Sequence, residues 1–176
     1  MNIPLGGRFA PFAGLVVKPS DPIAVVADAG RHAEVLTRLA RIGYDRVEGF
    51  LNSGFGAWRE ADKPVGQIAQ MSVDELHRRV TDESSSVSPT SAPAILDVRT
   101  AAEWDGGHIA GARHLPLAEL TQRVGEVPDG PRIAVLCGSG YRSAIAASLL
   151  KRAGRENLVN VTGGYAAYRA AADGVQ

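Results

Sequence analysis

The stretch from Ile133 to Ser143 constrains the fold more than any other part of the chain. The apolar run Ile-Ala-Val-Leu leads to Cys137, which is followed by Gly-Ser-Gly-Tyr-Arg and then by a helical pattern of small and apolar residues over 143–153. A short apolar run with β-branched residues is typical of a buried strand. The sequence therefore predicts a strand, a tight turn and a helix, with the thiol of Cys137 at the turn.

The turn after Cys137 is suited to hold a negatively charged sulfur. Gly138 and Gly140 permit the backbone angles of a tight cradle, so the N–H groups of residues 138–142 are expected to converge on the cysteine sulfur. The helix N-terminus and the Arg142 guanidinium both favour negative charge there. We therefore predict a nucleophilic thiolate; the alternative is a structural cysteine that closes a buried strand.

Composition narrows the classes of function. A single cysteine excludes an internal disulfide framework and a C-x-x-C metal or redox pair. The 19 basic and 19 acidic residues cancel, which gives no indication of a nucleic-acid or membrane partner. The N-terminus lacks a signal-peptide pattern, and no apolar run approaches the ~20 residues that span a bilayer. We expect a protein of reducing, cytoplasmic surroundings that binds anions only at a local site.

The chain contains an internal repeat at an offset of 110 residues. Shifting the sequence by this amount brings Ile23-Ala24-Val25 onto Ile133-Ala134-Val135 and Gly54 onto Gly164. A repeat of this length indicates two copies of one α/β unit.

The repeat predicts an incomplete copy followed by a complete one. Ile3-Pro4-Leu5 matches Leu115-Pro116-Leu117, so the first copy is expected to begin partway through the unit. The two domains are predicted at 1–66 and 67–176. A Ser- and Pro-rich stretch over 81–93 is predicted to be a flexible insertion in the second domain.

Strand and helix patterns alternate along both copies. Strands are predicted over 23–28, 46–51, 94–98, 132–137 and 158–162, and helices over 31–42, 54–61, 72–80, 116–124, 143–153 and 165–172. The helix at 72–80 opens with the capping box Ser72-x-x-Glu75. Alternation of this kind predicts an α/β fold with a parallel sheet and helices on both faces.

Three motifs of the second copy resemble signatures of the rhodanese family, sulfurtransferases that carry sulfur as a cysteine persulfide. The loop C-x-x-x-x-R-S resembles the active-site loop of the family. The first signature of the family resembles Asp97-Val-Arg99 together with Gly107-His108-Ile109, and the C-terminal signature resembles Gly163-Gly164-Tyr165. The resemblance implies a rhodanese-like parallel sheet over about 70–176. The implied site comprises the catalytic Cys137, the substrate-binding loop Gly138, Ser139, Gly140, Tyr141, Arg142 and Ser143, and the supporting Asp97 and Arg99, with no metal.

The supporting residues follow a predicted strand. Asp97 is expected at the C-terminal edge of the parallel sheet, where ligand sites of open α/β sheets lie. It is expected to hold Arg142 or the loop amides in place, with a plain surface carboxylate as the alternative. Arg99 and Glu103, four residues apart, are expected to pair with each other.

The resemblance implies a sulfurtransferase of the thiosulfate:cyanide type. Cys137 would take sulfur from thiosulfate or a low-molecular-weight persulfide and pass it to cyanide or a thiol, without a cofactor. Arg142 would attract the donor, Ser139 would donate a hydrogen bond, and Tyr141 would form a wall of the pocket. Two other functions stay open: a non-catalytic rhodanese-like interaction module, and a thiolate phosphatase, although phosphatases of this type have the longer loop C-x-x-x-x-x-R.

The first copy also resembles a rhodanese half, but Ala27 and Asp28 stand where the second has Cys137 and Gly138, so we expect it to be inactive. An inactive copy before an active one resembles the C-terminal part of fusions that join a metallo-β-lactamase-fold persulfide dioxygenase to rhodanese domains. This resemblance implies association with a persulfide dioxygenase. The apolar residues that an incomplete copy leaves uncovered predict a homodimer.

Overall fold

The computed structural model describes residues 1–81 and 92–173, which form two compact units. One unit comprises residues 3–67, and the other extends from residue 68 onward and includes residues 1 and 2. Of the predicted insertion, residues 82–91 lie outside the described residues. Within the described parts of the chain, every helix is too short or too polar to span a bilayer.

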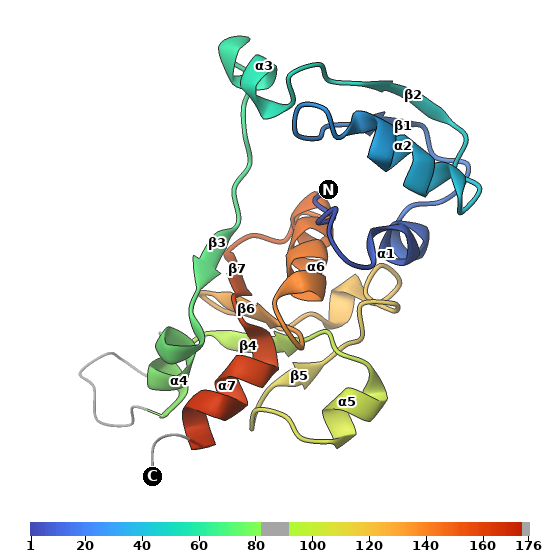
Figure 1. The fold of residues 1–176 in the computed structure, drawn as a ribbon. Coiled ribbons are helices and arrows are strands. Elements are labelled where there is room, and N and C mark those ends of the chain that lie inside the picture. The colour runs from blue at the N-terminus through green and yellow to red at the C-terminus, as the bar shows by residue number, and fades with distance from the viewer. Residues whose placement is uncertain (82–91, 174–176) are drawn as a thin grey trace. The chain divides into compact units, whose positions relative to one another are not determined.

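The larger unit is built on a five-stranded parallel sheet (Figure 1). Its strands are β3 (Ala69–Met71), β4 (Ala94–Asp97), β5 (Arg113–His114), β6 (Ile133–Leu136) and β7 (Leu158–Val161). The order is β3-β7-β6-β4-β5, and every neighbouring pair is parallel. Strand β6, which ends at the residue before Cys137, therefore lies in the middle of the sheet and is buried along its whole length.

Helices cover both faces of this sheet, as predicted (Figure 1). They are α4 (Val73–Thr81), α5 (Ala101–Asp105), α6 (Tyr141–Arg152) and α7 (Gly164–Asp173). Helices α4 and α7 pack on one face, over a core that includes Leu76, Leu136 and Val161. Helix α6 packs on β6 and β7 from the other face and buries Ile145 and Leu150 completely. The α/β class is therefore confirmed, and it leaves the C-terminal end of β6 as the natural place for a site.

Local signals account for most of these elements, and one predicted helix is wrong. Ser72 Oγ accepts a hydrogen bond of 3.1 Å from the Glu75 N–H, which is one half of the predicted capping box, while the Glu75 carboxylate pairs with Arg79. The helix predicted over 116–124 is instead a series of turns followed by a 3-10 helix at Val124–Glu126. The Leu117 N–H bonds to the Val98 carbonyl at 3.2 Å, which holds the chain along the end of β4 and prevents a helix from starting there.

Four short elements were not predicted. They are α1 (Phe9–Val16) in the smaller unit and β3, β5 and α5 in the larger one. Strands of two or three residues are too short to show an alternating pattern, so nothing in their sequence marks them.

The smaller unit has a core of its own around a two-stranded parallel sheet. Its elements are α1, β1 (Ile23–Val25), α2 (His32–Ala40), β2 (Val47–Phe50) and α3 (Phe55–Glu60). Phe9, Val35 and Leu39 are among the residues that form the core. Val26, Phe50, Phe55 and Trp58 remain exposed.

The two units share a strand register. Two pairs of facing residues match at an offset of 110: Ala24 with Gly49 and Val25 with Phe50 in one unit, and Ala134 with Val159 and Val135 with Asn160 in the other. The preceding pair is displaced by one residue, because a register shift between Ile23 and Ala24 pairs Ile23 with Val47. Gly54 and Gly164 have similar positive φ angles, 58° and 61°. A Cβ atom at Gly54 would overlap the carbonyl oxygen of Ala27, and one at Gly164 would overlap that of Cys137. The sequence offset of 110 is thus also an offset in backbone geometry.

Candidate active site

The loop after β6 aims hydrogen-bond donors at the sulfur of Cys137. The Gly140 N–H donates to Sγ at 3.1 Å, and the Ser143 hydroxyl donates to it at 3.4 Å. Gly140 has a φ of 95°, which a glycine adopts without strain, and it leads directly into α6. The Cys137 side chain is 1% exposed and Ser143 is fully buried, whereas Ser139 is exposed. Donors fixed in this way stabilise negative charge on sulfur.

The start of α7 holds the same loop from the other side. The Tyr165 N–H donates to the Cys137 carbonyl at 2.7 Å, and the Ala166 N–H donates to the Gly138 carbonyl at 3.1 Å. This close approach needs glycine at 164, because a Cβ atom there would lie 2.6 Å from the backbone of Gly138 and Ser139. The Gly-Gly-aromatic motif therefore positions the loop that carries the thiol.

Arg142 forms a bidentate ion pair with Glu103. Its Nη1 and Nη2 lie 2.6 and 2.5 Å from Glu103 Oε2 and Oε1. The Thr100 backbone N–H and hydroxyl donate to the same carboxylate at 3.0 and 2.7 Å. Hydrogen bonds from Arg142, which have the largest effect, and from Thr100 together lower the pKa of Glu103 to about 2, against the opposing effect of partial burial. Glu103 is therefore ionised at neutral pH.

Two predicted contacts are wrong. Asp97 does not hold Arg142; its carboxylate accepts from Arg99 Nε at 2.8 and 3.0 Å and from the Arg99 backbone N–H at 3.0 Å. Arg99 does not pair with the Glu103 carboxylate; it donates instead to the backbone carbonyls of Glu103 and Gly107 at 3.0 and 2.8 Å. The reason is burial: Arg99 and Asp97 are 3% and 0% exposed, and buried charges must satisfy each other.

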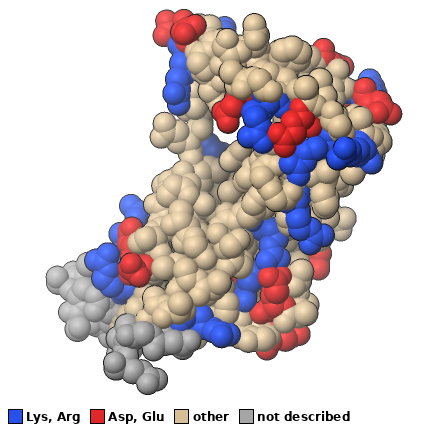
Figure 2. Space-filling model, in the orientation of Figure 1, with Lys and Arg blue, Asp and Glu red and all other residues tan. Residues whose placement is uncertain are grey.

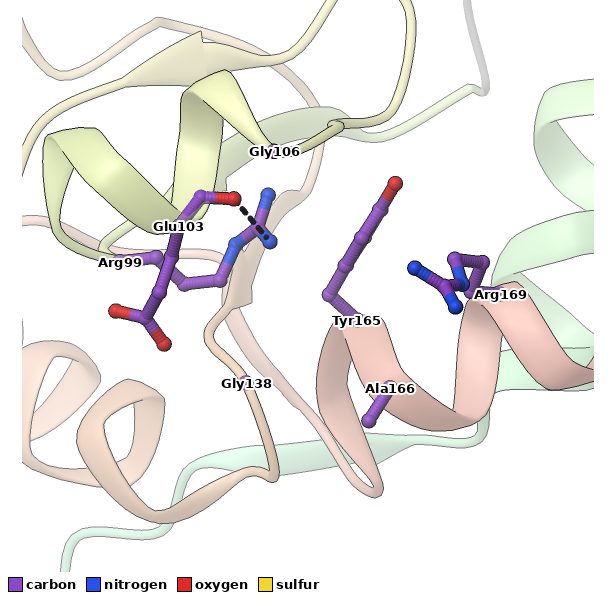
Figure 3. Close-up of a pocket in the computed structure, with 7 residues that line it drawn as sticks. All are labelled: Arg99, Glu103, Gly106, Gly138, Tyr165, Ala166 and Arg169. Carbon is purple, nitrogen blue, oxygen red and sulfur yellow. Dashed lines mark hydrogen bonds between the residues drawn. The ribbon is translucent and has the colours of Figure 1, made fainter.

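A pocket of about 410 Å³ opens beside the loop (Figure 3). It is lined by Arg99, Glu103, Gly106, Gly138, Tyr165, Ala166 and Arg169. The Arg99 guanidinium lies 3.9 Å from the centre of the Tyr165 ring, and Tyr165 stands between Arg99 and Arg169. Tyr141, predicted to wall the pocket, begins α6 and is not among these lining residues, all of which the structure describes.

Arg169 and Glu103 line the pocket although neither was predicted as a site residue, and Glu103 is the one that the sequence could have identified. The signal was present: Thr100-Ala-Ala-Glu103 is a capping box, and both of its reciprocal contacts form at the start of α5. Among residues 1–81 and 92–173 no cluster of three or more His, Cys, Asp or Glu side chains has a metal-binding arrangement. On the face shown in Figure 2, acidic and basic side chains are interspersed.

Comparison with known proteins places the larger unit in a family. The model of the rhodanese-like domain family matches residues 72–171, more than half of the chain. A sulfurtransferase of Allochromatium vinosum is 32% identical over 85 residues, which cover 48% of this chain and 79% of that protein. The thiosulfate sulfurtransferase GlpE of Pseudomonas putida is 29% identical over 99 residues, or 56% of this chain and 89% of that protein.

Two further relatives are matched over about half of their own length, and one similar domain has a solved structure. The chain spans about half the length of two Bacillus subtilis proteins: YrkF, described as a candidate sulfur carrier, with 35% identity over 101 residues, and YqhL, with 38% over 71. Those matches cover 57% and 40% of this chain, and 50% and 56% of the relatives. The solution structure of the rhodanese-like domain from Anabaena sp. Alr3790 has a TM-score of 0.50 and 28% identity, covering 60% of this chain and 76% of that domain. The chain belongs to the rhodanese-like domain family.

Proposed function

We propose that this chain is a sulfurtransferase that works through a persulfide on Cys137. The observation that carries the proposal is the pair of donors on the sulfur, the Gly140 N–H at 3.1 Å and the Ser143 hydroxyl at 3.4 Å. A neutral structural thiol needs no such donors, whereas a thiolate and a persulfide anion are both stabilised by them.

In the first half-reaction the Cys137 thiolate attacks the outer sulfur of thiosulfate or of a low-molecular-weight persulfide. A sulfur–sulfur bond forms to Cys137 as the donor's own bond breaks, and sulfite or a thiolate leaves with the electron pair. The Gly140 N–H and the Ser143 hydroxyl are placed to stabilise the anionic sulfur that results.

In the second half-reaction an acceptor takes the outer sulfur away. Cyanide or a thiolate attacks the terminal sulfur of the persulfide, which gives thiocyanate or a new persulfide and returns Cys137 to the thiolate. Electrons balance within each step, so the cycle requires no oxidant or reductant.

A thiolate phosphatase is the weaker alternative. Cys137 and Arg142 are separated by four residues instead of five, which leaves a smaller cradle above the sulfur. The Glu103 carboxylate on Arg142 would also repel a phosphate dianion at the position where it needs a cation. The remaining alternative, a non-catalytic interaction module, fits the first unit better than the second, because Ala27 stands at the position of the thiol.

Sulfur loading tests the proposed function. After treatment with thiosulfate or a thiol persulfide and removal of excess donor, the intact protein should gain the mass of one sulfur atom, and cyanide should remove it as thiocyanate. The same preparation is assayed with an aromatic phosphate ester. Phosphate release without sulfur loading would favour the phosphatase, and neither reaction would favour the interaction module.

We also propose that residues 1–66 are an incomplete and inactive rhodanese copy. Three observations support this: the offset of 110 in sequence, the same offset in strand register, and the matching close approach of Gly54 to Ala27 and of Gly164 to Cys137. In the larger unit β6 and β7 each have a further neighbour, β4 and β3, whereas β1 and β2 form a sheet of only two strands. The resemblance to persulfide dioxygenase fusions further suggests that such an enzyme supplies the donor.

We expect the two-stranded sheet of the smaller unit to pair with a second copy of the chain, because four large apolar residues of this unit are exposed: Val26, Phe50, Phe55 and Trp58. Light scattering of the purified protein should therefore give the mass of a dimer. A variant without residues 1–66 should be a monomer that loads sulfur as fast as the parent, because the two hydrogen-bond donors to Cys137 and every residue that lines the pocket lie after residue 66. A parent that stays monomeric at high concentration would contradict the pairing, and an inactive deletion variant would contradict the independence of the second copy.

A further inference from the structure

The cationic group nearest the thiol loop is already occupied by an anion of the protein itself. Arg142 presents two parallel N–H donors, an arrangement that matches one carboxylate or one sulfonate-type oxyanion at a time. Both donors are taken by Glu103, at 2.6 and 2.5 Å. An oxyanion that bound to these two N–H groups would have to displace the Glu103 carboxylate.

Displacing Glu103 is difficult because hydrogen bonds from Thr100 also hold its carboxylate in place. The Thr100 N–H and hydroxyl both donate to Oε2, at 3.0 and 2.7 Å, so the carboxylate that caps α5 is also the one that meets Arg142. The anchored position lowers the entropy cost that ordinarily weakens a partly exposed ion pair. The pair is therefore a fixed feature of the site.

The pair lies against the loop and beside the pocket. A Cβ atom at Gly138, the residue next to the thiol, would lie 3.2 Å from Arg142 Nη2 and 3.5 Å from Glu103 Oε1. Glu103 also lines the pocket, and in Figure 3 its carboxylate lies to the left of Gly138, on the side away from Tyr165. Of the two arginines that line the pocket, Arg99 is neutralised by Asp97, and Arg169 lies on the other side of the Tyr165 ring. A molecule that approaches the loop from this side therefore meets a carboxylate before it meets the charge of Arg142.

We propose that Glu103 is a specificity-determining residue, which neutralises Arg142 and so makes the site prefer persulfides of low charge over doubly charged donors such as thiosulfate. The inference rests on the proposed sulfurtransferase function and names its donor class. The physical reason is simple: repulsion from a fixed carboxylate grows in proportion to the charge of the incoming donor. A persulfide without further ionised groups carries one negative charge, and thiosulfate carries two.

Alkylation of Cys137 by two reagents of nearly equal size tests the charge effect directly. Iodoacetamide is neutral and iodoacetate is an anion, and Cys137 is the only cysteine, so each rate reports on one thiol. The ratio of the two rates cancels any change in the nucleophilicity of the sulfur. Glu103→Gln keeps a capping residue at this position but removes the charge. We expect it to raise the iodoacetate-to-iodoacetamide ratio about fivefold at low salt, with the increase shrinking as salt is added.

Two further variants sharpen the test. Thr100→Val removes the hydroxyl that anchors Glu103 and should raise the ratio in the same direction by a smaller factor, even if Glu103→Gln fails to fold. Glu126→Gln is the matched control, because Glu126 forms exposed ion pairs with Arg113 and Arg123 and does not line the pocket; its ratio should equal that of the parent.

Donor kinetics then connect the charge to sulfur transfer. In Glu103→Gln the KM for thiosulfate should fall about tenfold with little change in kcat, while the KM for a thiol persulfide without carboxylates changes less than about threefold. An alkylation ratio within twofold of the parent would overturn the inference, as would a Cys137 that neither reagent modifies. A ratio that rises in a protein that no donor loads with sulfur would leave the role of Glu103 intact and refute the proposed function instead.

Discussion

Replacing Cys137 with serine should abolish sulfur loading from every donor and leave the fold unchanged. The hydroxyl is smaller than the thiol, so it fits the same space, and its oxygen can accept the hydrogen bonds that the Gly140 N–H and the Ser143 hydroxyl give to the sulfur. A serine hydroxyl remains protonated at neutral pH and is a far weaker nucleophile than a thiolate. The variant should therefore bind donors and release nothing.

Mass spectrometry of the intact variant after exposure to thiosulfate or a thiol persulfide checks this expectation. Its thermal unfolding midpoint should match that of the parent within a few degrees, which shows that the loss is chemical. Sulfur transfer by Cys137→Ser at the parent's rate would exclude a persulfide mechanism, since the chain has no other thiol.

Replacing Gly164 with alanine should cost both stability and activity. Gly164 has a φ of 61°, where an alanine is strained by about 1 kcal/mol. The added Cβ would also overlap the Cys137 carbonyl and lie 2.6 Å from the backbone of Gly138 and Ser139. Because backbone atoms cannot rotate away as a side chain can, the loop or α7 must move, and overpacking of this kind costs roughly 2 kcal/mol more.

The matched control is Gly154→Ala. Gly154 also has a positive φ, 84°, but a Cβ atom there would meet no atom within 4 Å. The free energy of unfolding of Gly154→Ala should fall only by the cost of the backbone strain, about 1 kcal/mol, and the variant should load sulfur at the parent's rate. Urea unfolding and the loading assay on both variants separate the two effects. Equal losses in Gly154→Ala and Gly164→Ala would show that the close approach of α7 to the loop is unimportant.

Much of the fold was determined by local sequence. The segments at 94–98, 132–137 and 158–162 are apolar at most positions because both faces of a parallel sheet are buried, and this makes such strands easy to recognise. The position of the thiol between a strand and a helix follows from the same reasoning, since Gly138 and Gly140 stand between the two patterns. Each of these features depends only on residues that lie close together in the sequence.

The partners of the charged side chains could not be read from sequence. Four-residue spacing favoured a pair between Arg99 and Glu103, yet burial at the end of β4 commits Arg99 to Asp97. Glu103 then becomes available to Arg142, which is 39 residues away in the chain. Only the packing of α5 beside the β6–α6 loop brings them together.

A contact between distant residues also explains the turns at 117–122, because the Leu117 N–H bonds to the Val98 carbonyl at the end of β4. The sequence by itself determined the class of fold, the repeat at an offset of 110 and the position of the thiol between a strand and a helix, because each depends on residues close together or on a pattern repeated along the chain. Tertiary structure alone decided that Arg142 is neutralised and that Gly164 supports the loop, because desolvation and steric contact depend on neighbours that are distant in sequence.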